Sequence, residues 1–418
     1  MQEEGLTVDY HERTKGSRHL TEHITFWDET LRDGEQMPGV HFTAEEKLAI
    51  AEKLSEIGVE VINAGIPVVS AEEAKTVERL AHAGLKAKIL AAGRTVPGDV
   101  EAIIKSGASQ AAIFVAASNV HLRYKLQMTQ EQVIQAAQDT VSRAHEAGLF
   151  VSFVTEDTTR SDMGFVERLY SAAIDAGADR VVVSDTVGIM TPLTFRWFLR
   201  EFARVVRPKD WSVHCHNDFG QATANTLTAI EEGVNAPHVC VNGLGERAGN
   251  TSLEEVVMSL EILYGVKTGL KTEKLYELSQ LVEKLSGVPL PANKALVGYN
   301  AFSHEAGIHT HGVLRNSLTY EPLQPETVGR KRRFILGKHT GRAAIVERLK
   351  QQGYEATESQ VTRLTELVKL AGEAHGKGDT EQLLEKYHVL FEEPGLKEEE
   401  FQQLVKTAGI KARKAPKA

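Results

Sequence analysis

Residues 177–185 read GADRVVVSD, and the pattern of this stretch recurs through the first part of the chain and predicts its fold. Gly177 follows an apolar-periodic stretch typical of a helix, and a glycine just past a helix end adopts the left-handed turn without steric cost. The run after it is β-branched and almost continuously apolar, as expected for a parallel strand covered on both faces. The stretch therefore predicts a helix, a glycine turn and a buried parallel strand that ends in a polar residue, Asp185.

The same junction recurs along the chain. A glycine precedes each of five further runs, which are VEVINAG (59–65), LKAKILAA (85–92), ASQAAIFVAA (108–117), LFVSFVT (149–155) and NAPHVCVNG (235–243). ITFWD (24–28) opens the series, and WSVHCH (211–216) fills the gap before the last strand. Eight strands, each followed by a helix, predict an α/β fold of the (β/α)8 TIM-barrel type. The alternative is a doubly wound sheet, but TLRDGEQ (30–36) follows the first strand where that fold carries a glycine-rich dinucleotide loop.

The chain after the barrel has a different character. A segment rich in proline, glycine and asparagine begins near residue 286 and reads as a linker, and helical patterns return from about residue 343. The predicted organisation is a linker followed by small, mostly helical C-terminal subdomains. The predicted boundaries are an N-terminal tail (1–22), the barrel (23–285), a linker with a first accessory subdomain (286–345), a helical second accessory subdomain (346–410) and a basic tail (411–418).

Composition narrows the class of protein. The chain has 418 residues, of which 42% are hydrophobic and 25% charged, the balance of a globular protein with a large core. A net charge of −9 argues against general nucleic-acid binding. No apolar run is long enough to cross a membrane, and residues 1–21 lack the apolar core of a secretory signal. Two cysteines, Cys215 and Cys240, provide no disulfide framework. We therefore predict a cytoplasmic protein that binds neither nucleic acid nor membrane.

Polar residues gather where a barrel places its chemistry, at the C-terminal ends of the strands. Those that follow or end predicted strands are Arg32, Asp33, Gln36, Glu156, Asp157, Asp185, Thr186, His214, His216, Asn217, Asp218, Glu246, Arg247 and Asn250. The active site is therefore expected at this rim.

His214 and His216 are the sharpest local signal. Residues i and i+2 of a strand point to the same face, so the two imidazoles can converge on one metal ion. The alternative is a pair of hydrogen-bonded histidines. Asp33 at the same rim favours a divalent cation acting as a Lewis acid, and Asn250 could add a further oxygen. The guanidinium of Arg32 could hold a carboxylate or an enolate oxygen, or could simply form a salt bridge in a surface turn.

Two motifs lie beyond the barrel. HEAGIHTHG (304–312) carries three histidines but no carboxylate-rich partner accompanies it, so an acid/base or substrate-contacting role is favoured over a second metal site. GKHTGR (337–342) lacks the glycine spacing and the parallel-sheet context of a phosphate-binding loop.

Together, TLRDGEQ, HCHND, NGLGERAGN, HEAGIHTHG and GKHTGR resemble the Claisen-condensing metalloenzymes that include the 2-isopropylmalate, homocitrate and citramalate synthases. The five motifs occur in the family's order over roughly residues 24 to 345. The wording around NGLGERAGN resembles most that of the short homocitrate synthases of nitrogen-fixing bacteria, followed by the short archaeal-type homologues and the barrel half of 2-isopropylmalate synthase.

The resemblance implies an acyltransferase that condenses acetyl-CoA with a 2-oxo acid and releases CoA. It implies a divalent cation (Mg, Mn, Zn or Co), which would be held by Asp33, His214, His216 and Asn250. Arg32 would steady the keto oxygen, and Gln36 and Thr186 would contact the substrate. The acid/base set would be Glu156, His309 and Tyr320. A homodimer is implied, in which the segment bearing His309 reaches over the partner's barrel and completes its site.

The choice of 2-oxo acid depends on the residues that would face its distal end. Lysine-pathway homocitrate synthases carry an arginine on strand 5 where this chain has Ser152, so a dicarboxylic substrate would need another cation, with Arg94, His121 and Arg123 as candidates. Homocitrate synthesis from 2-oxoglutarate is favoured. The alternatives are 2-isopropylmalate or citramalate synthesis, or a synthase for another anionic 2-oxo acid such as phosphonopyruvate. A metal-dependent lyase, a biotin-linked carboxyltransferase and a non-enzymatic scaffold are less favoured.

Overall fold

The computed structural model describes residues 6–374, 382–385, 396–408 and 410. The chain falls into two compact units. The first contains the residues up to 303 together with 317–333, and the second contains 304–316 and the described residues from 334 onward.

Eight parallel strands form the centre of the first unit within the described residues. They lie in the order β7-β6-β5-β4-β3-β2-β1-β8. Asn235, just before β8, donates its N–H to the carbonyl of Trp211 at the start of β7 (3.4 Å), so the two outer strands meet and the ring closes. The strands are β1 (Trp27–Asp28), β2 (Val61–Asn63), β3 (Lys88–Arg94), β4 (Gln110–Ala116), β5 (Phe150–Glu156), β6 (Arg180–Asp185), β7 (Trp211–Cys215) and β8 (His238–Val239).

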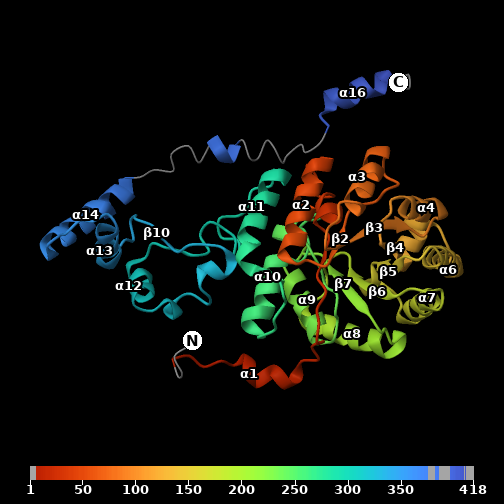
Figure 1. The fold of residues 1–418 in the computed structure, drawn as a ribbon, viewed down its shortest axis with the longest axis horizontal. Coiled ribbons are helices and arrows are strands. Elements are labelled where there is room, and N and C mark those ends of the chain that lie inside the picture. The colour runs from red at the N-terminus through yellow and green to blue at the C-terminus, as the bar shows by residue number, and fades with distance from the viewer. Residues whose placement is uncertain (1–5, 375–381, 386–395, 409, 411–418) are drawn as a thin grey trace, which may run out of the picture. The chain divides into compact units, whose positions relative to one another are not determined.

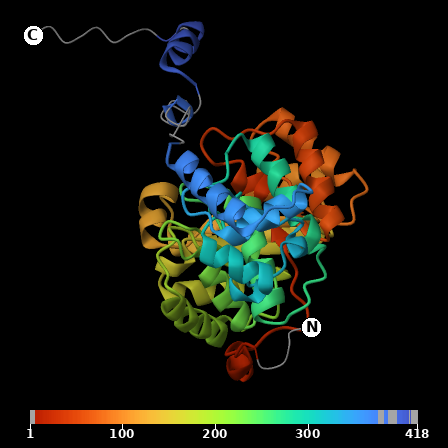
Figure 2. The same cartoon turned by 90° about the vertical axis from the view of Figure 1, so that its left-hand side faces the viewer.

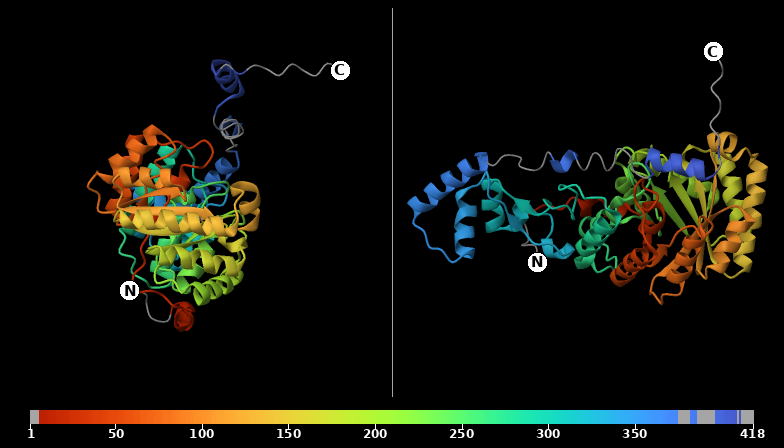
Figure 3. Two further views of the ribbon diagram at one scale, coloured as in Figure 1. Left: turned by 90° about the vertical axis from the view of Figure 1, so that its right-hand side faces the viewer. Right: turned by 90° about the horizontal axis from the view of Figure 1, so that it is seen from above.

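Helices surround these strands, as Figure 1 and the view from above in Figure 3 show. Several begin with a side-chain cap; Thr43, for example, forms a reciprocal capping box with Glu46 at the start of α2. The helices of this unit are α1 (His11–Thr14), α2 (Ala44–Ile57), α3 (Ala71–Ala81), α4 (Pro97–Lys105), α5 (Asn119–His121), α6 (Gln130–Glu146), α7 (Met163–Asp175), α8 (Pro192–Val206), α9 (Ala222–Glu231), α10 (Leu253–Met258) and α11 (Leu275–Ser286).

Alternation along the strands separates two cores. On β3, Leu90 and Ala92 belong to the cluster inside the barrel, whereas Ile89 and Ala91 belong to the larger cluster under the helices. Both sets are buried, which explains why the strands read as continuous apolar runs. The predicted (β/α)8 barrel, followed by a helical C-terminal region, is confirmed.

The second unit, coloured cyan to blue in Figure 2, is mainly helical. It contains α12 (Gly307–Arg315), α13 (Arg342–Gln351), α14 (Glu358–Ala374) and α16 (Glu398–Thr407), and the short strands β9 (Ser303–His304) and β10 (Arg333–Phe334) lie where the chain passes between the units. A Cβ on Gly307 would lie 2.7 Å from the Cα of Gly341, so the HEAGIHTHG and GKHTGR motifs pack backbone to backbone.

Of the helices in the described residues, none combines the length and the apolar character that a membrane crossing requires. The predicted basic tail, 411–418, lies outside the described residues. The predicted domain boundaries at residues 22, 285, 345 and 410 stay predictions.

Candidate active site at the mouth of the barrel

The loop after β1 places the first two functional side chains. Residues Thr30–Gly34 form a π-helical turn that carries Arg32 and Asp33 back over the end of the barrel. Asp33 is buried, and its carboxylate accepts a hydrogen bond from Arg32 Nη1 (3.0 Å). The turn thus holds a cation and an anion side by side at the rim.

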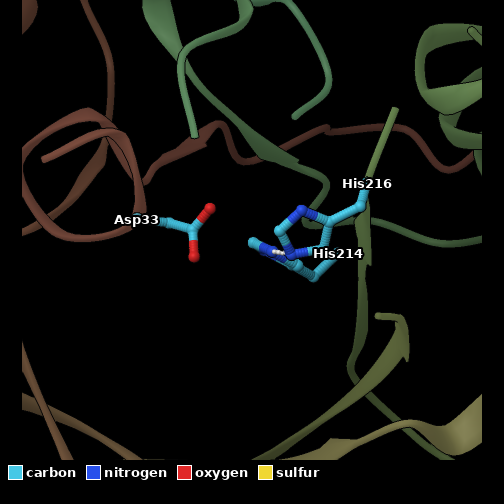
Figure 4. Close-up of side chains that lie close together, drawn as sticks. All are labelled: Asp33, His214 and His216. Carbon is cyan, nitrogen blue, oxygen red and sulfur yellow. Dashed lines mark hydrogen bonds between the residues drawn. The ribbon is translucent and has the colours of Figure 1, made fainter. Parts of the chain in front are cut away.

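His214 and His216 face Asp33 from β7. Both rings are buried, and their Nε2 atoms lie 3.2 Å apart. Figure 4 shows the Asp33 carboxylate directed toward the two imidazoles, which project from one strand. One ligand atom from each of the three residues lies within 4.8 Å of the other two. The alternation expected along this strand is confirmed, because Cys215 between the histidines belongs to the core beneath the helices.

Asn250 completes this group. A bridge between His216 and Asn250 brings the loop after β8 against β7, and the Asn250 amide donates to Asp33 Oδ2. Gly245 lies in the same loop with φ of 150°, and a Cβ there would lie 2.8 Å from Asp33 Oδ2 and still nearer to the Asn250 amide. Only glycine leaves room for this contact.

The electrostatics prepare these groups to bind a cation. Burial tends to raise the pKa of Asp33, but Arg32 and the two histidines outweigh it and lower that pKa to about 2. Burial lowers the pKa of His214 well below its ordinary value, and it also lowers the pKa of His216. At neutral pH the site therefore presents one carboxylate and two neutral imidazoles.

This donor set fits a divalent cation. Two neutral ring nitrogens 3.2 Å apart need either a shared proton or a cation between them. The buried Oδ1 of Asn250 has no hydrogen-bond partner among the described residues, so it can serve as a further oxygen ligand. Imidazole nitrogen with carboxylate and amide oxygen suits Mg²⁺, Mn²⁺, Zn²⁺ or Co²⁺.

A cavity of about 370 Å³ opens beside the group. Its apolar wall comes from the strand ends, and its polar residues lie around the rim. The apolar residues are Trp27, Ile66, Ala92, Ala112, Phe114 and Val154, and the others are Glu29, Arg32, Asp33, Gln36, Asn63, Lys125, Glu156, Ser184, Thr186, His214, His216, His238, Glu246 and Arg247.

Glu156 lies at the end of β5 with a lysine on its carboxylate. Lys125 Nζ is 2.7 Å from Oε1 and 2.6 Å from Oε2. The hydroxyl oxygen of Thr186, after β6, accepts a hydrogen bond from the Asp157 N–H (2.7 Å). This bond holds the ends of β5 and β6 together. These side chains can contact an anionic substrate and move a proton.

Comparison with known proteins identifies the family of this chain. The sequence profile of the HMGL-like family matches residues 23–282, and that of the homocitrate synthase post-HMGL domain matches residues 296–376. The chain belongs to the HMGL-like family. A probable 2-isopropylmalate synthase of Ignicoccus hospitalis is 45% identical over 375 residues, covering 90% of this chain and 94% of the relative. The homocitrate synthase AksA of Methanopyrus kandleri is 48% identical over 354 residues, covering 85% and 89%.

A solved structure shows the same fold. The HMG-CoA lyase of Bacillus subtilis matches with a TM-score of 0.59 and 23% identity, covering 66% of this chain and 97% of the lyase. The predicted resemblance to the 2-isopropylmalate, homocitrate and citramalate synthases is therefore confirmed.

The HMGL-like barrel brings together only some of the predicted site residues. Arg32, Asp33, Gln36, Glu156, Thr186, His214 and His216 line the cavity, and Asn250 contacts Asp33. Arg94 instead binds Asp99 through Nε (2.8 Å) and Nη2 (3.0 Å), and the Arg123 guanidinium lies over the Tyr124 ring. His121 binds Ser118 and Asp157, with Nε2 3.8 Å from Glu156. None of the three proposed distal cations lines the cavity.

The two residues predicted to arrive from beyond the barrel are not in the cavity wall either. Tyr320 belongs to the first unit, where it is exposed and does not line the cavity. His309 belongs to the second unit, on α12. Their roles stay predictions.

Sequence reasoning missed several residues that line this site. Lys125 sits in HLRYKL, where a run of charges reads as a solvated helix face, and only the π-helical turn Leu122–Leu126 places it at the rim. Glu29, Asn63 and His238 lie within or beside apolar strand runs. These residues could have been found from the sequence, because a charged or amide side chain inside a buried strand needs a polar partner.

Proposed function

We propose that this chain is an acyltransferase that condenses acetyl-CoA with a 2-oxo acid, dependent on a divalent cation. One observation carries the proposal: Asp33, His214 and His216 converge beside Arg32 at the mouth of a closed barrel, in a chain whose relatives are named as synthases. In the overall reaction the acetyl methyl group loses a proton, its carbon bonds to the keto carbon, and the keto oxygen takes up a proton to become a hydroxyl. Water then cleaves the thioester to release CoA.

Asp33, His214, His216 and the amide oxygen of Asn250 would hold the cation. When bound there, it would supply Lewis-acid polarisation of the keto group. Arg32 lies beside Asp33 and lines the cavity, so its guanidinium can stabilise negative charge that develops on the keto oxygen. Thr186 and Gln36 also line the cavity, and we propose that they contact the substrate carboxylate.

Removal of a proton from the acetyl methyl group requires a base. Glu156 lines the cavity and is our candidate within the barrel, with Lys125 on its carboxylate. We further propose that His309 and Tyr320 complete the acid/base set, and that they do so across a homodimer, each site combining one barrel with the partner's accessory segment.

For the 2-oxo acid we propose a short apolar side chain, as in 2-isopropylmalate or citramalate synthesis. The cavity wall along β1, β3, β4 and β5 is apolar, with Trp27, Phe114 and Val154 as its larger side chains. Each cation in the cavity wall already has a carboxylate partner: Arg32 binds Glu29 and Asp33, Lys125 binds Glu156, and Arg247 binds Asp218. A second anionic group on the substrate would have to displace one of these partners at a cost in free energy.

Homocitrate synthesis from 2-oxoglutarate, which the sequence alone favours, is the second candidate. The observation in its favour is Lys125, a flexible cation whose side chain is 51% exposed and which could leave Glu156 to bind a distal carboxylate.

A substrate panel tests both candidates. Purified enzyme with acetyl-CoA and Mn²⁺ is offered 2-oxoisovalerate, pyruvate, 2-oxoglutarate and phosphonopyruvate separately, and thiol release and the product mass are measured. The proposal expects the highest kcat/KM with 2-oxoisovalerate or pyruvate. A preference of about tenfold or more for 2-oxoglutarate, a difference of about 1.4 kcal/mol, would transfer the assignment to homocitrate synthesis.

A further inference from the structure

Another carboxylate of the cavity wall, Glu29, binds Arg32 beside the predicted metal site. It is only 1% exposed, yet it is not one of the predicted metal ligands, acid/base groups or substrate contacts. Asn63 on β2 donates its Nδ2 to both Glu29 oxygens (3.0 and 3.1 Å). A buried carboxylate costs free energy unless opposite charges and hydrogen bonds compensate for the lost water. The partners of Glu29 provide this compensation.

Glu29 holds Arg32 from the side opposite Asp33. Its Oε2 accepts from Arg32 Nε (2.6 Å) and lies 2.5 Å from Nη2, while Arg32 Nη1 binds Asp33 at 3.0 Å. The guanidinium is therefore fixed between two carboxylates. Because Glu29 neutralises its charge, Asp33 does not have to, and the Asp33 carboxylate stays available for a cation.

Glu29 also approaches the histidine pair through His238. His238 Nδ1 is 3.6 Å from Glu29 Oε1 and 3.2 Å from His214 Nδ1. In that contact one ring donates and the other accepts. When His214 donates from Nδ1, its Nε2 lone pair faces His216 and is free for a metal ion.

From this geometry, and resting on the proposed function, we propose that Glu29 is a positioning residue: it locks Arg32 between two carboxylates and so leaves Asp33 free to bind the divalent cation. It acts through Arg32 and does not itself touch the ion. Without its charge, Arg32 would turn more fully toward Asp33 and compete with the cation.

The test measures cation binding by the full chain without either substrate, so it does not depend on whether the proposed reaction is correct. Mn²⁺ is titrated into metal-free protein, and free Mn²⁺ is followed by electron paramagnetic resonance. We expect Glu29→Gln to weaken Mn²⁺ binding by about tenfold, the usual effect of losing a partner one shell behind a ligand. If the enzyme turns over, kcat should fall in the same variant while the KM for acetyl-CoA stays unchanged.

Asp28→Asn is the matched control. Asp28 is the neighbouring residue of β1, is equally buried and binds Thr30 instead of Arg32. Its loss can lower stability but should leave the Mn²⁺ affinity as in wild type. If Glu29 and Asp28 are both only structural, Glu29→Gln and Asp28→Asn should lose Mn²⁺ affinity to the same extent. That result would overturn the proposal.

A double-mutant cycle with Arg32→Lys tests whether Glu29 acts through Arg32. If Glu29 acts through the Arg32 guanidinium, Glu29→Gln should change Mn²⁺ affinity less than twofold in the Arg32→Lys background. An undiminished loss in that background, or wild-type affinity in Glu29→Gln itself, would contradict the proposal. If Glu29→Gln fails to fold, Glu29→Asp replaces it, because the shorter side chain keeps the charge but cannot reach Arg32 in the same way. Wild-type Mn²⁺ affinity in Glu29→Asp would also overturn the proposal.

Discussion

At the scale of single residues, the site is a set of matched charges. Asp33 is ionised because the Arg32 guanidinium lowers its pKa despite burial, and the histidines are neutral because burial lowers their pKa values. The spacing of His214 and His216 on a strand was enough to predict that they share a face. Their approach to Asp33 needed the barrel, because Asp33 lies in the turn after β1 and the histidines lie at the end of β7, which only ring closure brings together.

Asp33→Asn should abolish cation binding at this group. The amide is nearly the same size but carries no charge to offset that of the cation, so kcat/KM should fall at least about a hundredfold. Mn²⁺ titration and thiol release measure the two effects. Asp99→Asn is the control, because Asp99 binds Arg94 and does not line the cavity. Retained cation binding in Asp33→Asn would move the ligand set elsewhere.

Lys125→Met should separate the two substrate candidates. With an apolar 2-oxo acid, loss of the Lys125 contact to Glu156 should lower kcat about tenfold and leave the KM for the 2-oxo acid nearly unchanged. If the enzyme prefers 2-oxoglutarate, the KM for that substrate should instead rise strongly. Arg123→Met, in the same loop but outside the cavity, should change neither constant. Stability should shift by less than about 0.5 kcal/mol, because Lys125 is half exposed.

At the scale of elements, the strands were predictable and the turns were not. Parallel strands buried on both faces give apolar runs separated by glycine turns, so each run predicted one strand. The π-helical turns Thr30–Gly34 and Leu122–Leu126 leave no such pattern, yet they carry Arg32, Asp33 and Lys125 to the rim. Arg94 was a candidate substrate contact from sequence. The sequence did not show that Asp99, near the start of α4, binds its guanidinium.

Gly245→Ala tests the loop after β8. Its Cβ would press on both Asp33 and Asn250, so we expect about a tenfold loss of Mn²⁺ affinity, together with strain of about 1–3 kcal/mol from the positive φ. Gly84→Ala also has a positive φ, but nothing lies within 4 Å of the new Cβ. It should therefore cost stability alone, as thermal unfolding and Mn²⁺ titration would show. Equal Mn²⁺ affinities for the two variants would argue against a close fit around Asp33.

At the scale of the whole molecule, the question is how the second unit takes part. HEAGIHTHG and GKHTGR were recognised from sequence, and their packing through Gly307 and Gly341 gives both motifs a structural role. The sequence could not show which barrel His309 would serve, because a contact to a partner subunit would leave no local pattern in the chain. The proposed homodimer makes that role testable.

Mixing two inactive variants, Asp33→Asn and His309→Ala, tests a composite site. If each site uses one barrel and the partner's His309, a mixed dimer contains one intact site. Random exchange of subunits should then restore about a quarter of wild-type thiol release. Size-exclusion chromatography with two affinity tags would verify that mixed dimers form. Mixed dimers without restored activity would place His309 and Asp33 of one site on the same chain, or remove His309 from the reaction.

Thiol release from acetyl-CoA, measured with the preferred 2-oxo acid before and after metal removal, tests the proposed metal site most directly. We expect that release needs the 2-oxo acid, stops when the enzyme is stripped with a chelator, and returns when Mn²⁺, Mg²⁺, Zn²⁺ or Co²⁺ is added back. Release that continues at the full rate in metal-free enzyme would contradict the central claim that Asp33, His214 and His216 hold a cation required for condensation.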